Sequence, residues 1–311
     1  MRDFDLIVIG AGIAGATAAM CAGRLGLRVA VVEQLGPGGQ IINATRIDNM
    51  PGFPQGIAGI ELGPLLHEQA DAVGAEFVLD TVESLALDGR QRVVTCAGET
   101  LRAPALIVAA GSALRNLGIP GEAELLGHGV SHCASCDGPF FRGQRVMVIG
   151  GGDAALDEAL VLAEFASQVT VVHRRPALGA QHVLVERARS IDTIGFLPAT
   201  SVEAILGNGA VSAVRTRDLT GGEVREEPCG GVFVFVGLEP NTAFLGSLVA
   251  LDPAGHITTD LMMRTSLDGV FAAGDIRAQS VRLLAAAAGD GATAAVAAFR
   301  YLQSSTEIDV R

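Results

Sequence analysis

The sequence is poor in aromatic residues and in positive charge. It has no Trp and one Tyr among 311 residues, so its hydrophobic cores must be built from Val, Ile, Leu and Ala. Acidic residues outnumber basic ones by 34 to 22, a net charge of −12. This balance argues against nucleic acid as a partner, because phosphate binding needs an excess of Lys and Arg. It still permits an anionic cofactor held by a few arginines.

Cysteine is scarce as well. Five cysteines are an odd number and give no disulfide framework in a chain this long, so a cytoplasmic, reducing location is expected. The charge-free run 6–23 contains regularly spaced glycines and follows two aspartates, which argues against a signal peptide or a membrane span. With 49% hydrophobic and 18% charged residues, we expect a packed globular protein of two domains.

The chain contains an internal repeat. Residues 5–33 align without a gap with residues 145–173, and each segment has an apolar strand, a glycine-rich turn, an Ala- and Leu-rich helix and a second strand. In each copy, short apolar stretches separated by Asp-Gly or Asn-Gly follow, a pattern that favours β-hairpins, and a last apolar strand returns. The predicted fold class is therefore α/β, with two Rossmann-like dinucleotide-binding domains of three ββα layers.

A third returning segment, residues 269–275, follows the second module and leads into an Ala-rich helix over 281–299. We expect it to fold back onto the first module. The first domain would then be discontinuous, comprising residues 1–114 and 244–311, and the inserted domain would comprise residues 115–243. Glycine and proline cluster near both boundaries, as expected of hinges.

Both modules carry the glycine fingerprint of a dinucleotide-binding turn. Gly10 permits a tight turn, Gly12 lets the backbone approach a pyrophosphate, and Gly15 allows the helix to pack closely on the strand. The phosphates would bind the free amides at the start of the following helix. The second module has the G-x-G-x-x-A variant, with Gly150, Gly152 and Ala155 at the corresponding positions, and Asp153 of the same turn is a further candidate NADP-binding residue.

A diagnostic residue follows each turn at the same distance. In the first module it is Glu33, whose carboxylate suits a ribose 2′-hydroxyl, as in FAD or NAD. In the second it is His173, followed by Arg174 and Arg175, a cationic cluster that suits the 2′-phosphate of NADP(H). A solvated basic turn is the alternative interpretation. We therefore assign FAD to the first domain and NADP to the second, with further flavin contacts from Gly39, Gln40 and Asp275.

Cys133 and Cys136 form a C-x-x-C pair just before the second module. At the start of a helical turn such a pair can form a reducible disulfide, and the helix end can lower the pKa of one thiol. Asp137 could supply or remove the proton, although acids are also common at helix starts. A zinc site with His128 and His132, or two inert cysteines, are the alternatives. The isolated thiols, expected to be inert, are Cys21, Cys96 and Cys229.

A flavin joins these parts chemically, because it can accept a hydride from a nicotinamide and reduce a disulfide. The sequence also resembles the low-molecular-weight thioredoxin reductases over essentially its whole length. The motifs that carry the resemblance are GAGIAG, GPGGQ, NMPG, CASCDG, VIGGGDAALDEA, VHRR, GLEPNT and GVFAAGD.

The resemblance implies an enzyme that passes electrons from NADPH through FAD to the Cys133–Cys136 disulfide and on to a thioredoxin-like protein. It implies that Cys136 faces the flavin, that Cys133 attacks the partner disulfide and that Asp137 is the acid and base. A homodimer and a rotation between the domains are implied as well. The additional flavin contacts that it implies are Asn49, Val82, Gly274 and Arg282. Because the chain starts directly at the first strand, we expect no additional N-terminal dithiol domain.

Three positions depart from the family pattern. Gly179 stands where many relatives have another arginine, and Leu283 stands where a glutamine is usual after Arg282. His132 precedes Cys133 and could activate a thiol as a base or merely pack. These departures keep a second function open, an FAD-dependent dithiol oxidase that forms a disulfide in a small molecule or peptide. A nucleotide-sensing flavoprotein without turnover is a third possibility.

Overall fold

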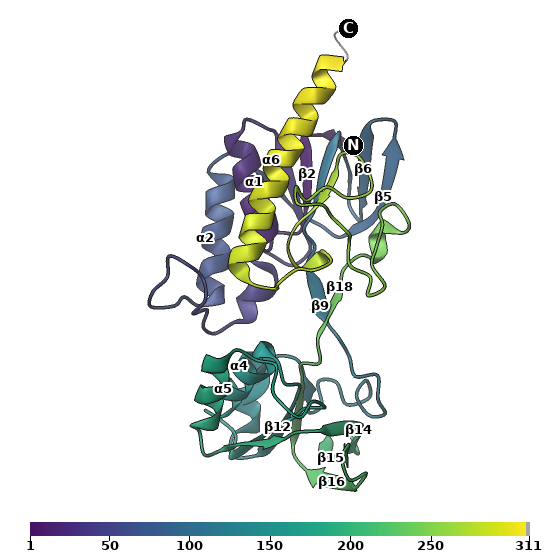
Figure 1. Ribbon diagram of the computed structural model, residues 1–311. Helices are drawn as coiled ribbons and strands as arrows, with labels where there is room; N and C mark the ends of the chain where they lie inside the picture. Colours follow the sequence, from purple (N-terminus) through teal and green to yellow (C-terminus); the bar gives the residue numbers. More distant parts are fainter. Residues whose placement is uncertain (309–311) are drawn as a thin grey trace. The chain divides into compact units, whose positions relative to one another are not determined.

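The chain folds into two compact units, as the computed structural model shows for residues 1–308 (Figure 1). Unit 1 comprises Met1–Ala113 and Glu239–Arg311, and unit 2 comprises Leu114–Leu238. The boundaries expected from sequence lay after residues 114 and 243. The first differs by one residue and the second by five, and at the second the chain leaves unit 2 through β18 (Leu238–Pro240), which pairs with β9 (Ser112–Leu114) as a two-stranded sheet.

Unit 1 is built on a parallel sheet of five strands in the order β19-β8-β2-β3-β4. The strands are β2 (Leu6–Ile9), β3 (Val29–Glu33), β4 (Glu76–Leu79), β8 (Ala105–Val108) and β19 (Val270–Ala272). Strand β19 lies beyond unit 2 in sequence and pairs with β8 in parallel register. The expectation that residues 269–275 return to the first module is therefore confirmed, and the domain is discontinuous.

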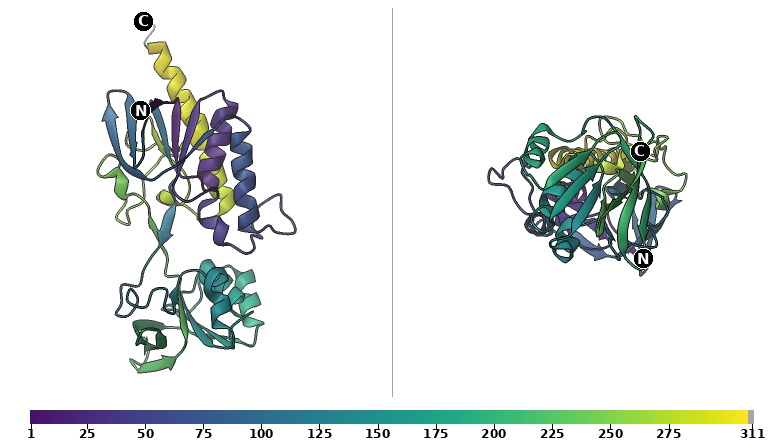
Figure 2. Two further views of the ribbon diagram at one scale, coloured as in Figure 1. Left: turned by 180° about the vertical axis from the view of Figure 1, so that it is seen from behind. Right: turned by 90° about the horizontal axis from the view of Figure 1, so that it is seen from below.

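Helices cover one face of this sheet and a β-meander covers the other (Figure 2). The helices are α1 (Ile13–Arg24), α2 (Gly59–Asp71) and α6 (Leu284–Ile308). Unit 1 also has the short 3₁₀ segments η1 (Gly39–Asn43), η3 (Ala243–Leu245) and η4 (Gly274–Ile276), of which η3 packs with the meander. The second layer consists of β1 (Arg2–Asp3), β5 (Val82–Asp88), β6 (Gln91–Cys96) and β7 (Thr100–Ala103).

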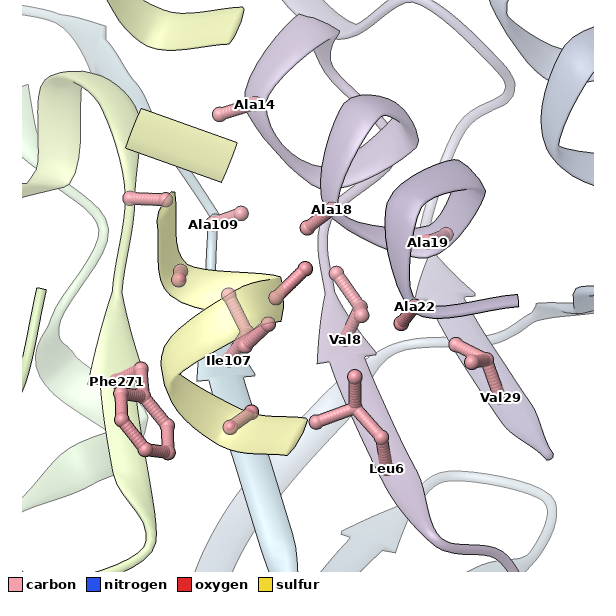
Figure 3. Close-up of a cluster of buried hydrophobic side chains, with 14 of the residues drawn as sticks. Leu6, Val8, Ala14, Ala18, Ala19, Ala22, Val29, Ile107, Ala109 and Phe271 are labelled. Carbon is pink, nitrogen blue, oxygen red and sulfur yellow. The ribbon is translucent and has the colours of Figure 1, made fainter. Parts of the chain in front are cut away.

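Strand β2 shows why both faces of the sheet are covered, since its apolar side chains point alternately to one face and to the other. Leu6 and Val8 pack with the helix alanines, whereas Ile7 and Ile9 pack with the meander. Figure 3 shows the helix side, where short side chains such as Ala18 meet the sheet. Small residues also let α6 approach α1 closely. The run 6–23 is thus a buried strand, a turn and a helix, as predicted.

Unit 2 repeats the same three layers. Its parallel sheet has the order β10-β17-β11-β12-β13. The strands are β10 (Val130–Ser131), β11 (Arg145–Ile149), β12 (Gln168–Val172), β13 (Ile194–Leu197) and β17 (Gly231–Val234). The helical layer contains α3 (Ala134–Asp137), η2 (Gly138–Phe141), α4 (Asp153–Leu162) and α5 (His182–Arg189), and the meander contains β14 (Thr200–Gly207), β15 (Val211–Asp218) and β16 (Val224–Pro228).

The two modules correspond element by element, since β2, α1 and β3 of unit 1 match β11, α4 and β12 of unit 2. The predicted repeat and fold class are confirmed. In both units the central strand runs directly into the glycine turn, so each turn lies at the carboxyl end of a parallel sheet, where α/β proteins bind ligands. Among residues 1–308 no helix has both the length and the hydropathy of a membrane span.

Candidate functional site

The first glycine turn joins β2 to α1, and its glycines have different surroundings. Gly10 has a φ of 99°, and a Cβ atom there would lie 2.4 Å from the carbonyl oxygen of Ala109. A Cβ on Gly15 would lie 1.8 Å from the carbonyl oxygen of Gly10. The fold itself therefore excludes side chains at both positions. A Cβ on Gly12, at the N-cap of α1, would have the carbonyl oxygen of Gly38 as its nearest neighbour, at 4.0 Å. The space at Gly12 fits a pyrophosphate approaching the helix start.

Glu33, the last residue of β3, lies beside this turn. Its Oε2 accepts the amide N–H of Ala11 at 2.7 Å, and its Oε1 accepts that of Leu35 at 3.0 Å. Each carboxylate oxygen has a second lone pair, so both can still accept a hydrogen bond from a ribose hydroxyl. The first turn and Glu33 together fit the adenosine half of FAD.

The loop after β3 also reaches the turn. The amide of Gly38 donates to the carbonyl of Ala11 at 2.9 Å, and a Cβ on Gly39 would lie 3.2 Å from the Cα of Gly12. The Nε2 of Gln40 donates to the carbonyl of Ser112 at 3.4 Å. The structure thus brings Gly39 to the first turn and places the Gln40 side chain at Ser112, the first residue of β9.

The returning segment places Gly274 and Asp275 on the same side of unit 1. A Cβ on Gly274 would lie 2.9 Å from the Cβ of Ala14 in α1. The backbone oxygen of Asp275 accepts the hydroxyl of Ser112 at 3.2 Å, a residue that follows β8. Asp290 of α6 holds this segment, because its Oδ2 accepts both the Gly274 amide at 3.1 Å and the Arg277 Nε at 2.9 Å. Sequence reasoning missed Asp290, although an acid inside an Ala-rich helix was a visible signal.

The other flavin contacts implied by the resemblance lie further out. Asn49 is exposed in the loop before α2, and Val82 is a half-buried residue at the start of β5. Arg282 is exposed and has a φ of 55°, and its amide donates to Ser280, whose hydroxyl donates to Asp275. Of the three, Arg282 is therefore linked to the Asp275 segment. The contacts of Asn49 and Val82 with a flavin stay predictions.

The second glycine turn joins β11 to α4 in the same manner. Gly150 has a φ of 145°, and a Cβ there would lie 2.2 Å from the carbonyl oxygen of Phe235. Gly152, at the N-cap of α4, has no neighbouring atom within 4 Å of a Cβ. The buried Ala155 fills the third position. As at the first turn, the first glycine is required by backbone packing and the second leaves open space. The space at Gly152 fits a second pyrophosphate.

Asp153, the first residue of α4, turns towards α5 and not towards the open face of the turn. Its two oxygens accept the backbone amide of Gln181 at 2.7 Å and the Nε2 of the same residue at 2.6 Å. The amide of Gly179 donates to the carbonyl of Gly151 at 2.7 Å. These bonds fix residues 174–181, which follow β12, against the glycine turn.

The structure does not support the cationic role expected of His173. The residue is 7% exposed, and a Cβ on Gly151 would lie 2.9 Å from the His173 Cβ. Burial lowers the pKa of His173, against a smaller opposing effect of a backbone hydrogen bond with Arg175. Burial thus disfavours the cationic form of the ring. The charge available for a 2′-phosphate comes from Arg174 and Arg175, both of which are exposed.

Cys133 and Cys136 are joined in a disulfide at the start of α3, with their Cα atoms 5.3 Å apart. Cys133 is the N-cap residue, and its sulfur accepts the amide of Cys136 at 3.2 Å. The amide of Cys133 donates to the hydroxyl of Ser131 at 3.0 Å. Asp137 ends α3, and its amide donates to the carbonyl of Cys133 at 3.1 Å. Cys133 is half-buried and Cys136 is exposed, so a reaction partner can reach the pair.

His132 anchors the dithiol segment to the central sheet. Its Nδ1 lies 3.1 Å from the carbonyl oxygen of Val234, at the end of β17. A carbonyl only accepts, so Nδ1 carries the hydrogen and Nε2 has the free lone pair in the neutral ring. His128 is exposed. Within the described residues, no three His, Cys, Asp or Glu side chains are grouped as metal ligands.

The remaining thiols are poor nucleophiles. Burial raises the pKa of Cys96 to about 11 and that of Cys229 to about 12. Burial also raises the pKa of the half-buried Cys21. Because the thiolate is the reactive form, these three residues are inert near neutral pH, as expected from the sequence.

Glu158 of α4 is a second residue that sequence reasoning missed. Its Oε2 accepts the amide of Ala134 at 2.5 Å, directly after Cys133. Burial raises the pKa of Glu158; the hydrogen bond from Ala134 lowers it, and the neighbouring Asp157 raises it further. The signal in the sequence was an acid placed among the buried positions of an apolar helix.

Comparison with known proteins settles the family. The profile of the pyridine nucleotide-disulphide oxidoreductases matches residues 4–291. The chain belongs to this family. It is 43% identical over 302 residues to the thioredoxin reductase of Treponema pallidum, covering 97% of this chain and 98% of that protein. It is 41% identical to the Listeria innocua thioredoxin reductase, covering 98% and 96% of the two chains.

Solved structures agree with this assignment. The Lactococcus lactis thioredoxin reductase matches with a TM-score of 0.95 and 38% identity, covering 97% of this chain and 99% of that one. The T. acidophilum thioredoxin reductase matches with a TM-score of 0.93 and 35% identity, covering 98% and 99%. The resemblance to the low-molecular-weight thioredoxin reductases is confirmed, and the chain is an FAD- and NADP-dependent disulfide oxidoreductase.

Proposed function

We propose that this flavoenzyme uses NADPH to reduce the disulfide of a thioredoxin-like protein. The observation that carries the proposal is the accessible Cys133–Cys136 disulfide at the start of α3, in the same unit as the second glycine turn. The other cysteines are chemically inert at neutral pH, so this pair is the redox centre that a disulfide substrate can meet. The relatives named thioredoxin reductases support the choice of partner.

Unit 1 would hold FAD and unit 2 would hold NADP(H). Gly12 would admit the FAD pyrophosphate to the start of α1, while Glu33 would accept a ribose hydroxyl. In unit 2, Gly152 would admit the NADP pyrophosphate, and Arg174 and Arg175 would bind the 2′-phosphate. Bound FAD supplies two-electron transfer between the nicotinamide and sulfur. The residues that complete the proposed FAD site are Gly10, Gly15, Gly39, Gln40, Asn49, Val82, Gly274, Asp275 and Arg282.

The dithiol would then carry two electrons to the partner. Reduction breaks the S–S bond and leaves two thiols after uptake of two electrons and two protons. The Cys133 thiolate attacks one sulfur of the partner disulfide and forms a mixed disulfide. Cys136 next attacks the Cys133 sulfur, which releases the partner as a dithiol and restores the enzyme disulfide. Asp137 would hold and return the proton of this exchange, and the Nε2 lone pair of His132 is a second acceptor close to Cys133.

We also propose a homodimer in the cytoplasm. The resemblance to the low-molecular-weight thioredoxin reductases supports the dimer, and three thiols kept outside disulfides suit a reducing compartment. Light scattering of the purified holoenzyme measures the first point directly: a mass of two chains is expected, and a single-chain mass contradicts it.

An anaerobic assay tests the proposed direction of electron flow. NADPH is added to the yellow holoenzyme, followed by oxidised thioredoxin and a chromogenic disulfide. We expect the flavin absorbance to bleach and thioredoxin-dependent turnover to follow. Bleaching by a dithiol substrate without thioredoxin reduction contradicts the proposal in favour of a dithiol oxidase. Bleaching by NADPH with no turnover of any disulfide contradicts it in favour of a sensor.

Matched cysteine variants test the redox centre. Cys136→Ser is expected to retain FAD and lose turnover, because no second sulfur is left to close the disulfide. Cys21→Ser, at a half-buried thiol outside any disulfide, is the control and is expected to keep wild-type turnover. A fully active Cys136→Ser enzyme removes the pair from the mechanism.

A further inference from the structure

We propose that Glu158 is a positioning residue that sets the reactivity of the Cys133–Cys136 dithiol through the amide of Ala134. The inference rests on the proposed role of this dithiol. It concerns a carboxylate on α4, the helix that begins at the second glycine turn, and its contact with the short helix that carries both sulfurs.

The contact is short, and it joins a fully buried donor to a half-buried carboxylate. Ala134 is the first residue of α3 and is fully buried, and its amide donates to the Oε2 of Glu158 at 2.5 Å. The amide of Cys136, two residues later, donates to the sulfur of Cys133 at 3.2 Å. The amides at the start of α3 are therefore divided between a carboxylate and a sulfur. Each donor that the carboxylate takes is withheld from a thiolate at Cys133.

The division has a chemical consequence once the disulfide is reduced. Free amides at the start of a helix stabilise a thiolate, whereas a negative charge close by destabilises it. An ionised Glu158 would destabilise a Cys133 thiolate in two ways. It accepts the hydrogen bond of the Ala134 amide, and it places a negative charge next to the residue that follows Cys133. Glu158 and the Cys133 thiol therefore compete for one negative charge, as coupled acids do.

The surroundings of Glu158 favour the protonated form of its carboxyl when Cys133 forms a thiolate. Burial raises the pKa of the Glu158 carboxyl, and the negative charge of Asp157 on the same helix raises it further. In the sequence, the titratable residues that flank the two cysteines are His132 and Asp137, both on the dithiol segment itself. Uptake of a proton by Glu158 would relieve the repulsion as Cys133 ionises, so the carboxyl moderates the reducing power of the pair.

Glu158→Gln isolates the charge. The amide side chain keeps the size of the glutamate and an oxygen that can accept the Ala134 N–H, but it cannot ionise. With the negative charge gone, the Cys133 thiolate should be more stable. We expect iodoacetamide to alkylate the reduced dithiol of the variant about threefold to tenfold faster at pH 7, with the pH profile moved to lower pH. In a glutathione buffer, the equilibrium should shift towards the dithiol form, and the shift should grow as the pH rises and the thiolate becomes the main species.

Glu164→Gln is the matched control, since Glu164 lies on the chain just after α4 and is exposed. Its alkylation profile should coincide with that of the wild type. Glu158→Ala removes the acceptor as well as the charge, and it should also show faster alkylation together with a lower Tm, because the buried Ala134 amide loses its partner. Peptide mapping assigns the label to Cys133 or Cys136.

A Glu158→Gln profile that coincides with the wild type overturns the proposal, provided that its circular dichroism matches. So does an equal shift in Glu164→Gln. Alkylation of the reduced chain needs neither NADPH nor a thioredoxin-like partner. An enzyme that fails to reduce thioredoxin but shows the Glu158 shift would therefore contradict the proposed function alone, and the reverse result would contradict this inference alone.

Discussion

The Cβ atom that Gly15 lacks would lie 1.8 Å from the carbonyl oxygen of Gly10. At Gly12, between them, the nearest atom to a Cβ is 4.0 Å away. One fingerprint therefore contains two kinds of glycine. Gly15 is required by the packing of α1 on its own turn, whereas Gly12 leaves a space that a ligand can enter.

Alanine substitutions should separate these two requirements. Gly15→Ala forces backbone atoms apart, so we expect unit 1 to lose roughly 1–3 kcal/mol or more of stability, with loss of FAD as a consequence. Gly12→Ala should fold with a Tm of the apoprotein near the wild-type value but retain little FAD. Thermal unfolding of the apoproteins and the flavin-to-protein absorbance ratio measure both effects. An equal fall of apoprotein Tm in the two variants contradicts the distinction.

The elements of the fold were predictable because their signals are local. Strand β2, the turn at Gly10 and helix α1 are contiguous, and their residue types alone fix the period and the turn. The discontinuous domain was also predictable, since residues 269–275 repeat the pattern of the earlier returning strands and need a sheet to join. The exact second boundary was not, because it depends on the pairing of β18 with β9.

The missed parts of the site depend on tertiary contacts. His173 was expected to be charged, but residues 174–181 and the glycine turn bury it. Asp153 was predicted to belong to the NADP site, and the sequence does not reveal that its side chain bonds with Gln181, 28 positions away. Glu158 meets Ala134 across 24 positions. No spacing rule identifies such partners, because they are selected by how α4 packs on α3 and α5.

Gly179 offers room for the arginine that many relatives have there. A Cβ at Gly179 would meet only the Nη1 of Arg175 at 3.6 Å and the carbonyl oxygen of Gly151 at 3.7 Å, both ordinary contacts. The backbone bond to Gly151 would be kept. We expect Gly179→Arg to lower the KM for NADPH about fivefold through an exposed charge contact with the 2′-phosphate, and to leave the KM for NADH unchanged.

Steady-state kinetics with both nucleotides at two salt concentrations measure this effect. The gain for NADPH should shrink at high salt, because exposed charges are screened. Gly179→Ala is the control for the added Cβ. An equal gain for NADH would mean that the arginine acts elsewhere than on the 2′-phosphate.

The pair formed by Asp153 and Gln181 should govern selectivity without touching the nucleotide. Gln181→Ala keeps the backbone amide that donates to Asp153 but removes the side-chain bond. The loop of Arg174 and Arg175 would then be less well fixed. We expect a severalfold higher KM for NADPH, a smaller change for NADH, and an unchanged kcat with saturating NADPH. A parallel rise for both nucleotides would show that the pair supports the pyrophosphate turn instead.

Burial of His173 should make the stability of unit 2 depend on pH. Burial lowers the pKa of His173 in the folded protein below its ordinary value of 6.5. As the pH falls, His173 therefore binds a proton more readily in the unfolded chain than in the folded one. Stability is then fully present above pH 6.5 and is lost progressively below it. We expect His173→Phe, which has no titratable ring, to show a smaller fall in Tm between pH 7.5 and pH 5.5. The exposed His182 provides the control His182→Gln, whose Tm should follow the wild type.

The same variant tests where the charge for the 2′-phosphate comes from. Because burial disfavours the cationic form of His173, its loss should leave the ratio of the KM values for NADPH and NADH within about twofold of the wild type, whereas Arg174→Ala should raise it about tenfold. Kinetics at pH 7.5 measure both ratios. If His173→Phe changes nucleotide preference as strongly as Arg174→Ala does, the ring carries charge in the holoenzyme.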